Sequence, residues 1–160
     1  MSPDTDGQQR TRTLGDDGVI GFEFLPFLVL VFVVGILLFA QAWSVMDAKL
    51  ATAAGAREAA RAYVEAPPDA SASAAHAAAL AAGRSAADAH GGGRSTTIRA
   101  LAGAGAFERC QRVVFEASQE VSAIPLPFLR GATAFTVTST HSEVVDPFRD
   151  GLEGELSCVG

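Results

Sequence analysis

Positive charge and cysteine are scarce in this chain of 160 residues, and both shortages exclude classes of function. Lysine and arginine number 12 against 18 aspartates and glutamates, which gives a formal net charge of -6. A nucleic-acid-binding surface needs clustered basic residues that neutralise phosphates, and the few arginines here are scattered. The two cysteines and three histidines do not have the spacing of zinc ligands. We therefore expect neither a metal site nor a nucleic-acid partner.

Sequence motifs of catalysis are also missing. The chain has no Gly-x-Ser-x-Gly elbow, and the triple glycine at 91–93 is followed by Arg94 where a phosphate-binding loop would need its lysine. His76, His90 and His141 stand far apart in the sequence and are each expected at the surface. We predict that the protein is not an enzyme and needs no cofactor.

What the chain does have is one membrane-length apolar run, residues 24–40, preceded directly by Glu23. A helix over residues 19–43 would be about 37 Å long, more than the ~30 Å of a bilayer's hydrocarbon core. Trp43 stands near its end, where an amphipathic ring suits a membrane interface. A carboxylate this close to hydrocarbon is costly and by default has a function. The run predicts a single-pass membrane helix in contact with lipid.

The residues around that carboxylate resemble the processing site of type IV prepilins. Gly18 is followed after four residues by Glu23 and then by the aromatic Phe24, at the start of the apolar run. The resemblance implies that a prepilin peptidase cuts between Gly18 and Val19, so that Glu23 becomes the fifth residue of the mature chain. It also implies that Glu23 pairs with the new α-amino group of a neighbouring subunit, because the two opposite charges neutralise each other in hydrocarbon.

A second stretch is similar to one family within this group. Residues 53–63, Ala-Ala-Gly-Ala-Arg-Glu-Ala-Ala-Arg-Ala-Tyr, resemble the segment after the membrane helix in TadE-like pseudopilins of the tight-adherence pilus system, with Arg57, Glu58 and Arg61 as its charged positions. The resemblance covers about a third of the chain. It implies a minor pilin or pseudopilin with a cytoplasmic N-terminus and an extracytoplasmic C-terminal domain. Its partners would be other pilin subunits, the pilus assembly platform and membrane lipids.

Two other interpretations of the apolar run stay open. Ala40-Gln41-Ala42 has the small-x-small form of a signal peptidase site, which would release a secreted binding domain after Ala42. The run is longer than a usual signal core, and residues 1–18 hold four aspartates against two arginines, which disfavours that interpretation. An uncleaved single-pass accessory protein is the third possibility.

The rest of the sequence predicts an α+β fold. The first helix should continue to about Glu65, before Pro67-Pro68, with a local kink at Pro26. Alternation of β-branched and polar residues indicates a small antiparallel sheet of two to four strands whose edges can accept another chain. The expected organisation has four parts: a leader at 1–18, a long helix at 19–65, a helical segment with a glycine hinge at 66–93 and a β-containing domain at 94–160. The alanine-rich helix of the third part is expected within 74–89. The strands of the last part are expected within 95–101, 107–121 and 132–145.

The two cysteines, Cys110 and Cys158, both fall in the part expected outside the membrane. An intramolecular disulfide is favoured there. It would stabilise the folded protein by on the order of 4 kcal/mol in the chain-entropy model, because it restricts the unfolded chain. Free thiols or an intersubunit bond are the alternatives. The acidic residues of the last fifteen positions are expected to form a solvated, flexible tail.

Overall fold

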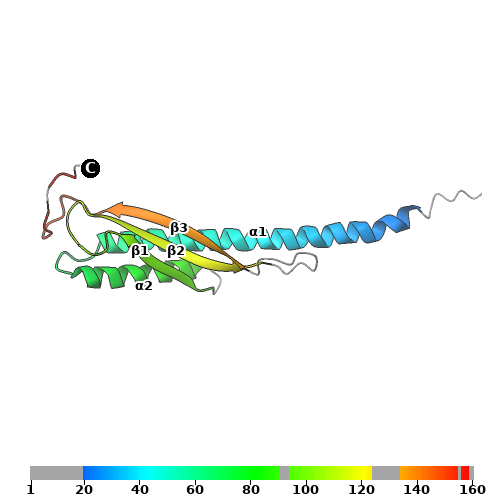
Figure 1. Ribbon diagram of the computed structural model, residues 1–160, viewed down its shortest axis with the longest axis horizontal. Coiled ribbons are helices and arrows are strands. Elements are labelled where there is room, and N and C mark those ends of the chain that lie inside the picture. Colours follow the sequence, from blue (N-terminus) through cyan, green and yellow to red (C-terminus); the bar gives the residue numbers. More distant parts are fainter. Residues whose placement is uncertain (1–19, 91–93, 124–133, 155, 159–160) are drawn as a thin grey trace, which may run out of the picture. The chain divides into compact units, whose positions relative to one another are not determined.

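The computed structural model describes residues 20–90, 94–123, 134–154 and 156–158, with side chains from Phe24 onward. The chain divides into two units, Met1–Leu38 and Phe39–Gly160. The described elements are two helices, α1 (Ile20–Val64) and α2 (Ala72–His90), and three strands, β1 (Thr96–Ala102), β2 (Arg112–Ser122) and β3 (Ala134–Val144) (Figure 1). The fold is of the α+β class.

Helix α1 runs without interruption through Pro26. A proline lacks the N–H that would bond four residues back, so its cost falls as it nears the first turns of a helix. At the other end the helix stops at Val64, shortly before Pro67 and Pro68, which do not continue a helix. Helix α2 begins after Ser71, whose hydroxyl accepts a hydrogen bond from the Ala74 N–H at 3.2 Å and so caps the helix N-terminus.

The C-terminal part of α1 and helix α2 lie side by side (Figure 1) and approach closely because small residues line their contact. A Cβ placed on Gly83 would lie 2.8 Å from the carbonyl oxygen of Gly55 and 2.9 Å from the Ala59 Cβ. Neither distance leaves room for a methyl group. On α2 the buried residues recur every fourth position, at Ala75, Ala79, Gly83 and Ala87.

The three strands form an antiparallel sheet in the order β1-β2-β3, so β2 is central and β1 and β3 are edge strands. One face of β2 is buried at every second residue, and the other is half-buried or exposed. The buried face carries Val113, Phe115 and Ala117, which form one core with small residues of both helices, including Ala59 and Ala79. The domain is therefore a sheet with helices packed on one face.

The described strands differ most from the prediction at the start of β2. The sequence pattern predicted a strand from residue 107, but β2 begins only at Arg112. Cys110 has a positive φ of 61°, a left-handed conformation that an extended strand does not contain. The bulky residues at 107–110 instead form the connection into β2, where Phe107 packs its ring edge-on against Tyr63 with ring centroids 5.5 Å apart.

Candidate functional site: the apolar segment of α1 and the groove beside β3

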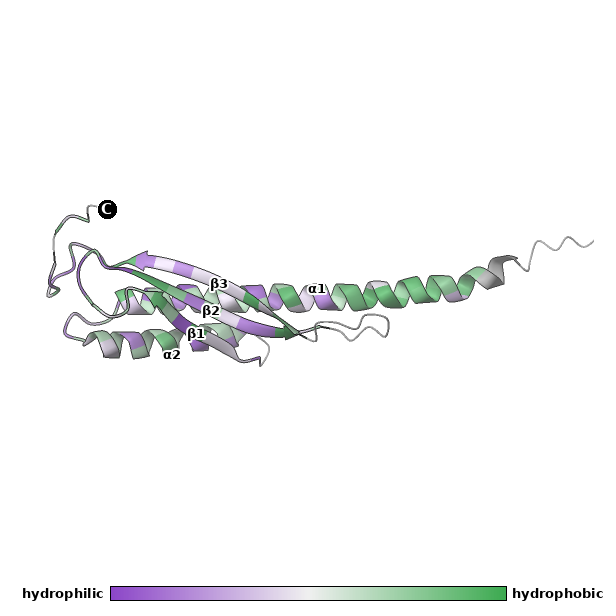
Figure 2. Ribbon diagram, viewed as in Figure 1, coloured by the Kyte–Doolittle hydropathy of each residue, from purple (hydrophilic) through white to green (hydrophobic). Residues whose placement is uncertain are grey.

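The N-terminal part of α1 exposes apolar side chains on all sides. In residues 24–38, here called the apolar segment, the exposed large side chains range from 37% exposed at Val34 to 67% at Phe32. An 18-residue window of α1 has a mean hydropathy of 2.7 and no buried residue, and Figure 2 shows this part of the helix as continuously hydrophobic. A helix that is apolar all round needs an apolar surrounding. Among the described residues, α1 is the one helix long and apolar enough to cross a membrane.

Only some of the predicted processing and assembly residues belong to the described part of the chain. Gly18 and Val19 lie outside the described residues. Glu23 belongs to α1, but its side chain also lies outside them. Phe24 is 59% exposed, and its ring contacts Phe27 edge-on at a centroid distance of 5.4 Å. Glu23 and Phe24 thus belong to a helix, and the predicted roles of Gly18, Val19, Glu23 and Phe24 stay predictions.

Beyond the apolar segment, α1 changes from an all-round apolar helix to one with a buried face. Trp43 is exposed and its ring lies 6.2 Å from that of Phe39. From Phe24 onward, the first fully buried residue of α1 is Ala48, and from there the small residues of the helix face the core. An exposed tryptophan one to two turns before the folded domain is what a membrane interface would accommodate.

In the family-like stretch, small and charged residues have different surroundings. Ala56, Ala59 and Ala60 are buried in the core, whereas Arg57 and Arg61 are exposed and Glu58 is half-buried. Arg61 donates to Glu65 one turn later at 3.0 Å, and because both side chains are exposed, solvent screens this pair and it adds little to the stability. The alanines therefore serve close packing, and the two arginines remain available to solvent.

Tyr63 ends this stretch, and no pattern in the sequence predicts a role for it. It is fully buried, lies outside the apolar segment, and donates its hydroxyl to the Ala106 carbonyl oxygen at 2.8 Å. Burial raises the pKa of this phenol above its usual value, because the charged form would lose its hydration. Its ring also packs against Phe115 at 6.0 Å. Tyr63 thus ties the end of α1 to the sheet and to the loop before β2.

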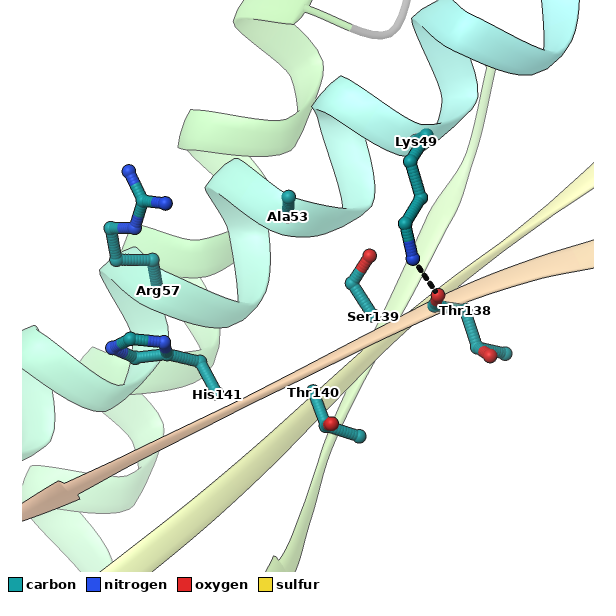
Figure 3. Close-up of a pocket in the computed structure, with 7 residues that line it drawn as sticks. All are labelled: Lys49, Ala53, Arg57, Thr138, Ser139, Thr140 and His141. Atoms are coloured by element: carbon teal, nitrogen blue, oxygen red, sulfur yellow. Dashed lines mark hydrogen bonds between the residues drawn. The ribbon is translucent and has the colours of Figure 1, made fainter.

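A groove runs between α1 and the edge strand β3 (Figure 3). It has a volume of about 380 Å³ and is lined by Lys49, Ala53 and Arg57 of α1 and by residues 138–141 of β3. Lys49 donates its Nζ to the Thr138 carbonyl oxygen at 2.7 Å. Beside it the hydroxyls of Thr52 and Ser139 are hydrogen-bonded at 2.8 Å. The groove combines two cations with the backbone of an edge strand.

His141 lines the same groove and is half-buried, with its Nε2 3.3 Å from Glu143 Oε1. His76 was expected at the surface, but it is half-buried and its ring stacks on Phe115 at 6.0 Å. His90 is exposed at the end of α2. Among the described residues no group of three or more histidine, cysteine, aspartate or glutamate side chains could hold a metal ion.

The described residues of 146–158 are fixed to the domain, which corrects the expectation of a flexible tail. The acidic side chains of Asp146, Asp150 and Glu153 are exposed, as expected. A disulfide joins Cys110 to Cys158. The Arg109 N–H donates to the Glu153 carbonyl oxygen at 2.9 Å, and Leu152 is buried. The prediction failed because it counted the acidic residues in the tail and ignored its one arginine, Arg149.

Arg149 caps the C-terminus of α1. Its guanidinium donates to the carbonyl oxygens of Val64, Glu65 and Ala66, with a distance of 3.0 Å to Glu65. These carbonyls have no partner within the helix, and a positive charge there also interacts favourably with the helix dipole. The same guanidinium lies 5.8 Å from the centroid of the Phe107 ring. An arginine in an otherwise acidic tail was the sequence signal for this contact.

Comparisons with protein-family models, with curated proteins and with solved structures found no match to this chain.

Proposed function

We propose that this protein is a membrane-anchored structural subunit of a type IV pilus system, a TadE-like minor pilin or pseudopilin. One observation carries the proposal. The helix α1 (Ile20–Val64) is continuous, exposes apolar side chains on all sides in residues 24–38, and from Ala48 onward forms part of the core of an α+β domain. Such a helix suits a subunit that is held in the bilayer and can contact neighbouring subunits along its length.

The prepilin-like residues supply the rest of the proposal. Cleavage after Gly18 by a prepilin peptidase would create an α-amino group at Val19, on the cytoplasmic side of the membrane. Glu23 of one subunit would then pair with the Val19 α-amino group of a neighbouring subunit. Both charges lie in a medium of low dielectric, where an unpaired charge is costly. The domain beyond Trp43 would be extracytoplasmic, and the disulfide between Cys110 and Cys158 suits an oxidising compartment.

A released binding domain is the second candidate function, and one observation favours it. The buried residues of α1 begin at Ala48, so a chain cut after Ala42 would keep its core. Against it, such a chain would use neither Glu23 nor the Gly18 site.

The test is the N-terminus of the mature protein. The full chain is expressed with an active prepilin peptidase, with an inactive variant of that peptidase and as the Gly18→Val variant, and the intact mass of each product is measured. We expect the product to begin at Val19 in one sample only, the one in which the peptidase is active and Gly18 is unsubstituted. A chain that begins at Trp43 would instead establish the released domain, and an uncut Met1 in all three samples would leave a plain membrane anchor.

The assembly role of Glu23 has a separate test. Glu23→Ala should leave membrane insertion and cleavage intact but lower pilus yield, because the lost carboxylate matters only between subunits. Glu120→Ala, at an exposed position of β2, is the matched control and should assemble normally. Normal pilus yield from Glu23→Ala would contradict the role.

A further inference from the structure

The edge strand β3 has backbone groups that no described strand pairs. Val145, directly after β3, donates its N–H to the Gln111 carbonyl oxygen at 2.9 Å and accepts from the Cys110 N–H at 3.0 Å. In an antiparallel pair, the N–H and C=O of one residue point to the same side and alternate along the strand. The backbone N–H and C=O groups of the odd-numbered residues of β3 therefore point to β2. The backbone groups of the even-numbered residues point to the open edge, and these residues include Thr136, Thr138, Thr140 and Ser142.

Lys49 covers part of this edge. Its Nζ donates to the Thr138 carbonyl oxygen at 2.7 Å, which agrees with the outward direction of that carbonyl. Lysine beside an edge strand discourages unwanted strand pairing, because an incoming neutral strand must displace or bury its charge. A strand that carries a carboxylate at this place would give Lys49 a new partner in exchange for the carbonyl.

The groove beside the edge is cationic along its length. Lys49, Ala53 and Arg57 are spaced by four residues on α1, so each step rises about 6 Å. Ala53 leaves the middle of the groove open, and Figure 3 shows Lys49 and Arg57 at opposite ends. Arg57 is exposed, and none of the ion pairs among the described residues involves it. The nearest acidic group on the strand, Glu143, is already in contact with His141.

The spacing of these cations matches that of an extended strand. Side chains on one face of a strand recur about every 6.8 Å, so two carboxylates four residues apart are separated by roughly 14 Å. Lys49 and Arg57 are separated by about 12 Å along the axis of α1. A strand added to the open edge of β3 could thus place one carboxylate at each cation while its backbone pairs with Thr138 and Thr140.

We propose that this groove binds an extended acidic segment of another protein, which adds to the sheet beside β3, and that Lys49 selects acidic strands over neutral ones. The partner is a different chain, because the described acidic segments of this protein do not fit: β1 carries no acidic residue and β3 only Glu143. Asp146, Asp150 and Glu153 lie in a segment that is held to its own domain by Arg149 and by the disulfide between Cys110 and Cys158. Strand addition supplies affinity through the backbone, and the two cations supply specificity. The proposal goes beyond the proposed function and does not require cleavage or a pilus.

The experiment uses the full isotope-labelled chain in detergent micelles and three eight-residue peptides of alternating Thr-Glu, Thr-Gln and Thr-Lys. Amide NMR spectra and hydrogen exchange locate each peptide. We expect the Thr-Glu peptide alone to shift and protect the Thr138 and Thr140 amides, with an affinity that falls as salt is raised. Arg57→Gln should weaken it about 3- to 5-fold, the size expected for one exposed ion pair, and Arg84→Gln, on the exposed side of α2, should not.

The Lys49→Gln variant distinguishes two roles for Lys49, which either selects acidic strands over neutral ones or only prevents other strands from pairing with β3. We expect this variant to bind the Thr-Gln peptide about as well as the Thr-Glu peptide, because the charge that disfavours neutral strands is gone. The proposal is overturned if the unchanged protein binds none of the peptides at β3, if it binds all three equally, or if Arg57→Gln has no effect. Self-association of Lys49→Gln without peptide binding to the unchanged protein would show that Lys49 only protects the edge.

Discussion

Replacing Arg149 should destabilise the domain more than replacing any exposed arginine. Its guanidinium donates to the last three carbonyl oxygens of α1 and the residues that follow it, those of Val64, Glu65 and Ala66. Hydrogen bonds to a charged group contribute about 1.5–3 kcal/mol each when buried, but these share one half-buried side chain. The interaction with the helix dipole adds about 0.3–1 kcal/mol. We expect Arg149→Ala to lower the free energy of unfolding by about 2–4 kcal/mol.

Two variants make this prediction specific. Arg149→Lys keeps the positive charge but has one nitrogen in place of the planar fork, so it should recover less than half of the loss. Arg112→Ala removes an exposed arginine at the start of β2 and should change the stability by less than about 0.5 kcal/mol. Urea unfolding of the full chain in detergent micelles, followed by pulse proteolysis, measures all three. A loss below about 0.5 kcal/mol for Arg149→Ala would refute the capping role.

Two further changes test the packing and the disulfide. Gly83→Ala should lower the free energy of unfolding by about 1–2 kcal/mol, because overpacking against the Gly55 carbonyl outweighs the ~1 kcal/mol that alanine gains in a helix. Gly105→Ala is its control, because nothing lies within 4 Å of the added Cβ. Equal effects at both glycines would contradict the close approach of the two helices. Cys110→Ser should cost about 2–4 kcal/mol by opening the bond to Cys158, and a reducing agent should then destabilise the unchanged protein and leave the variant unaffected in the same unfolding assay.

The helices were predictable from the sequence because their ends carry local signals. Pro67 follows the end of α1 closely and the triple glycine at 91–93 follows α2, so the observed ends at Val64 and His90 lie one residue from the prediction. The alternating residues of β3 predicted its strand in the same way, since period-2 patterning is a property of the segment itself. The start of β2 was missed because the left-handed conformation of Cys110 leaves no recognisable pattern.

The candidate site was predictable only in part. The apolar segment follows from composition, and its exposure agrees with a helix suited to a membrane. The groove beside β3 joins Lys49 to Thr138, 89 positions later, and no local pattern predicts which helix residue meets which strand residue. Arg149 was missed for the same reason. The roles of Gly18, Val19 and Glu23 depend on the resemblance and stay predictions.

The bonds made by Arg149 also set an order of events in folding. They join residues 83 to 85 positions apart, whereas α1 and α2 are joined by a short turn at residues 65–71. Contacts between distant residues form later than local ones, because a long loop must close before they are made. The helix pair can therefore form early, with the last carbonyls of α1 exposed to water. Only the arrival of Arg149 and of the described residues after it completes the domain, so a chain interrupted before Arg149 would lack both the cap on α1 and the disulfide to Cys110.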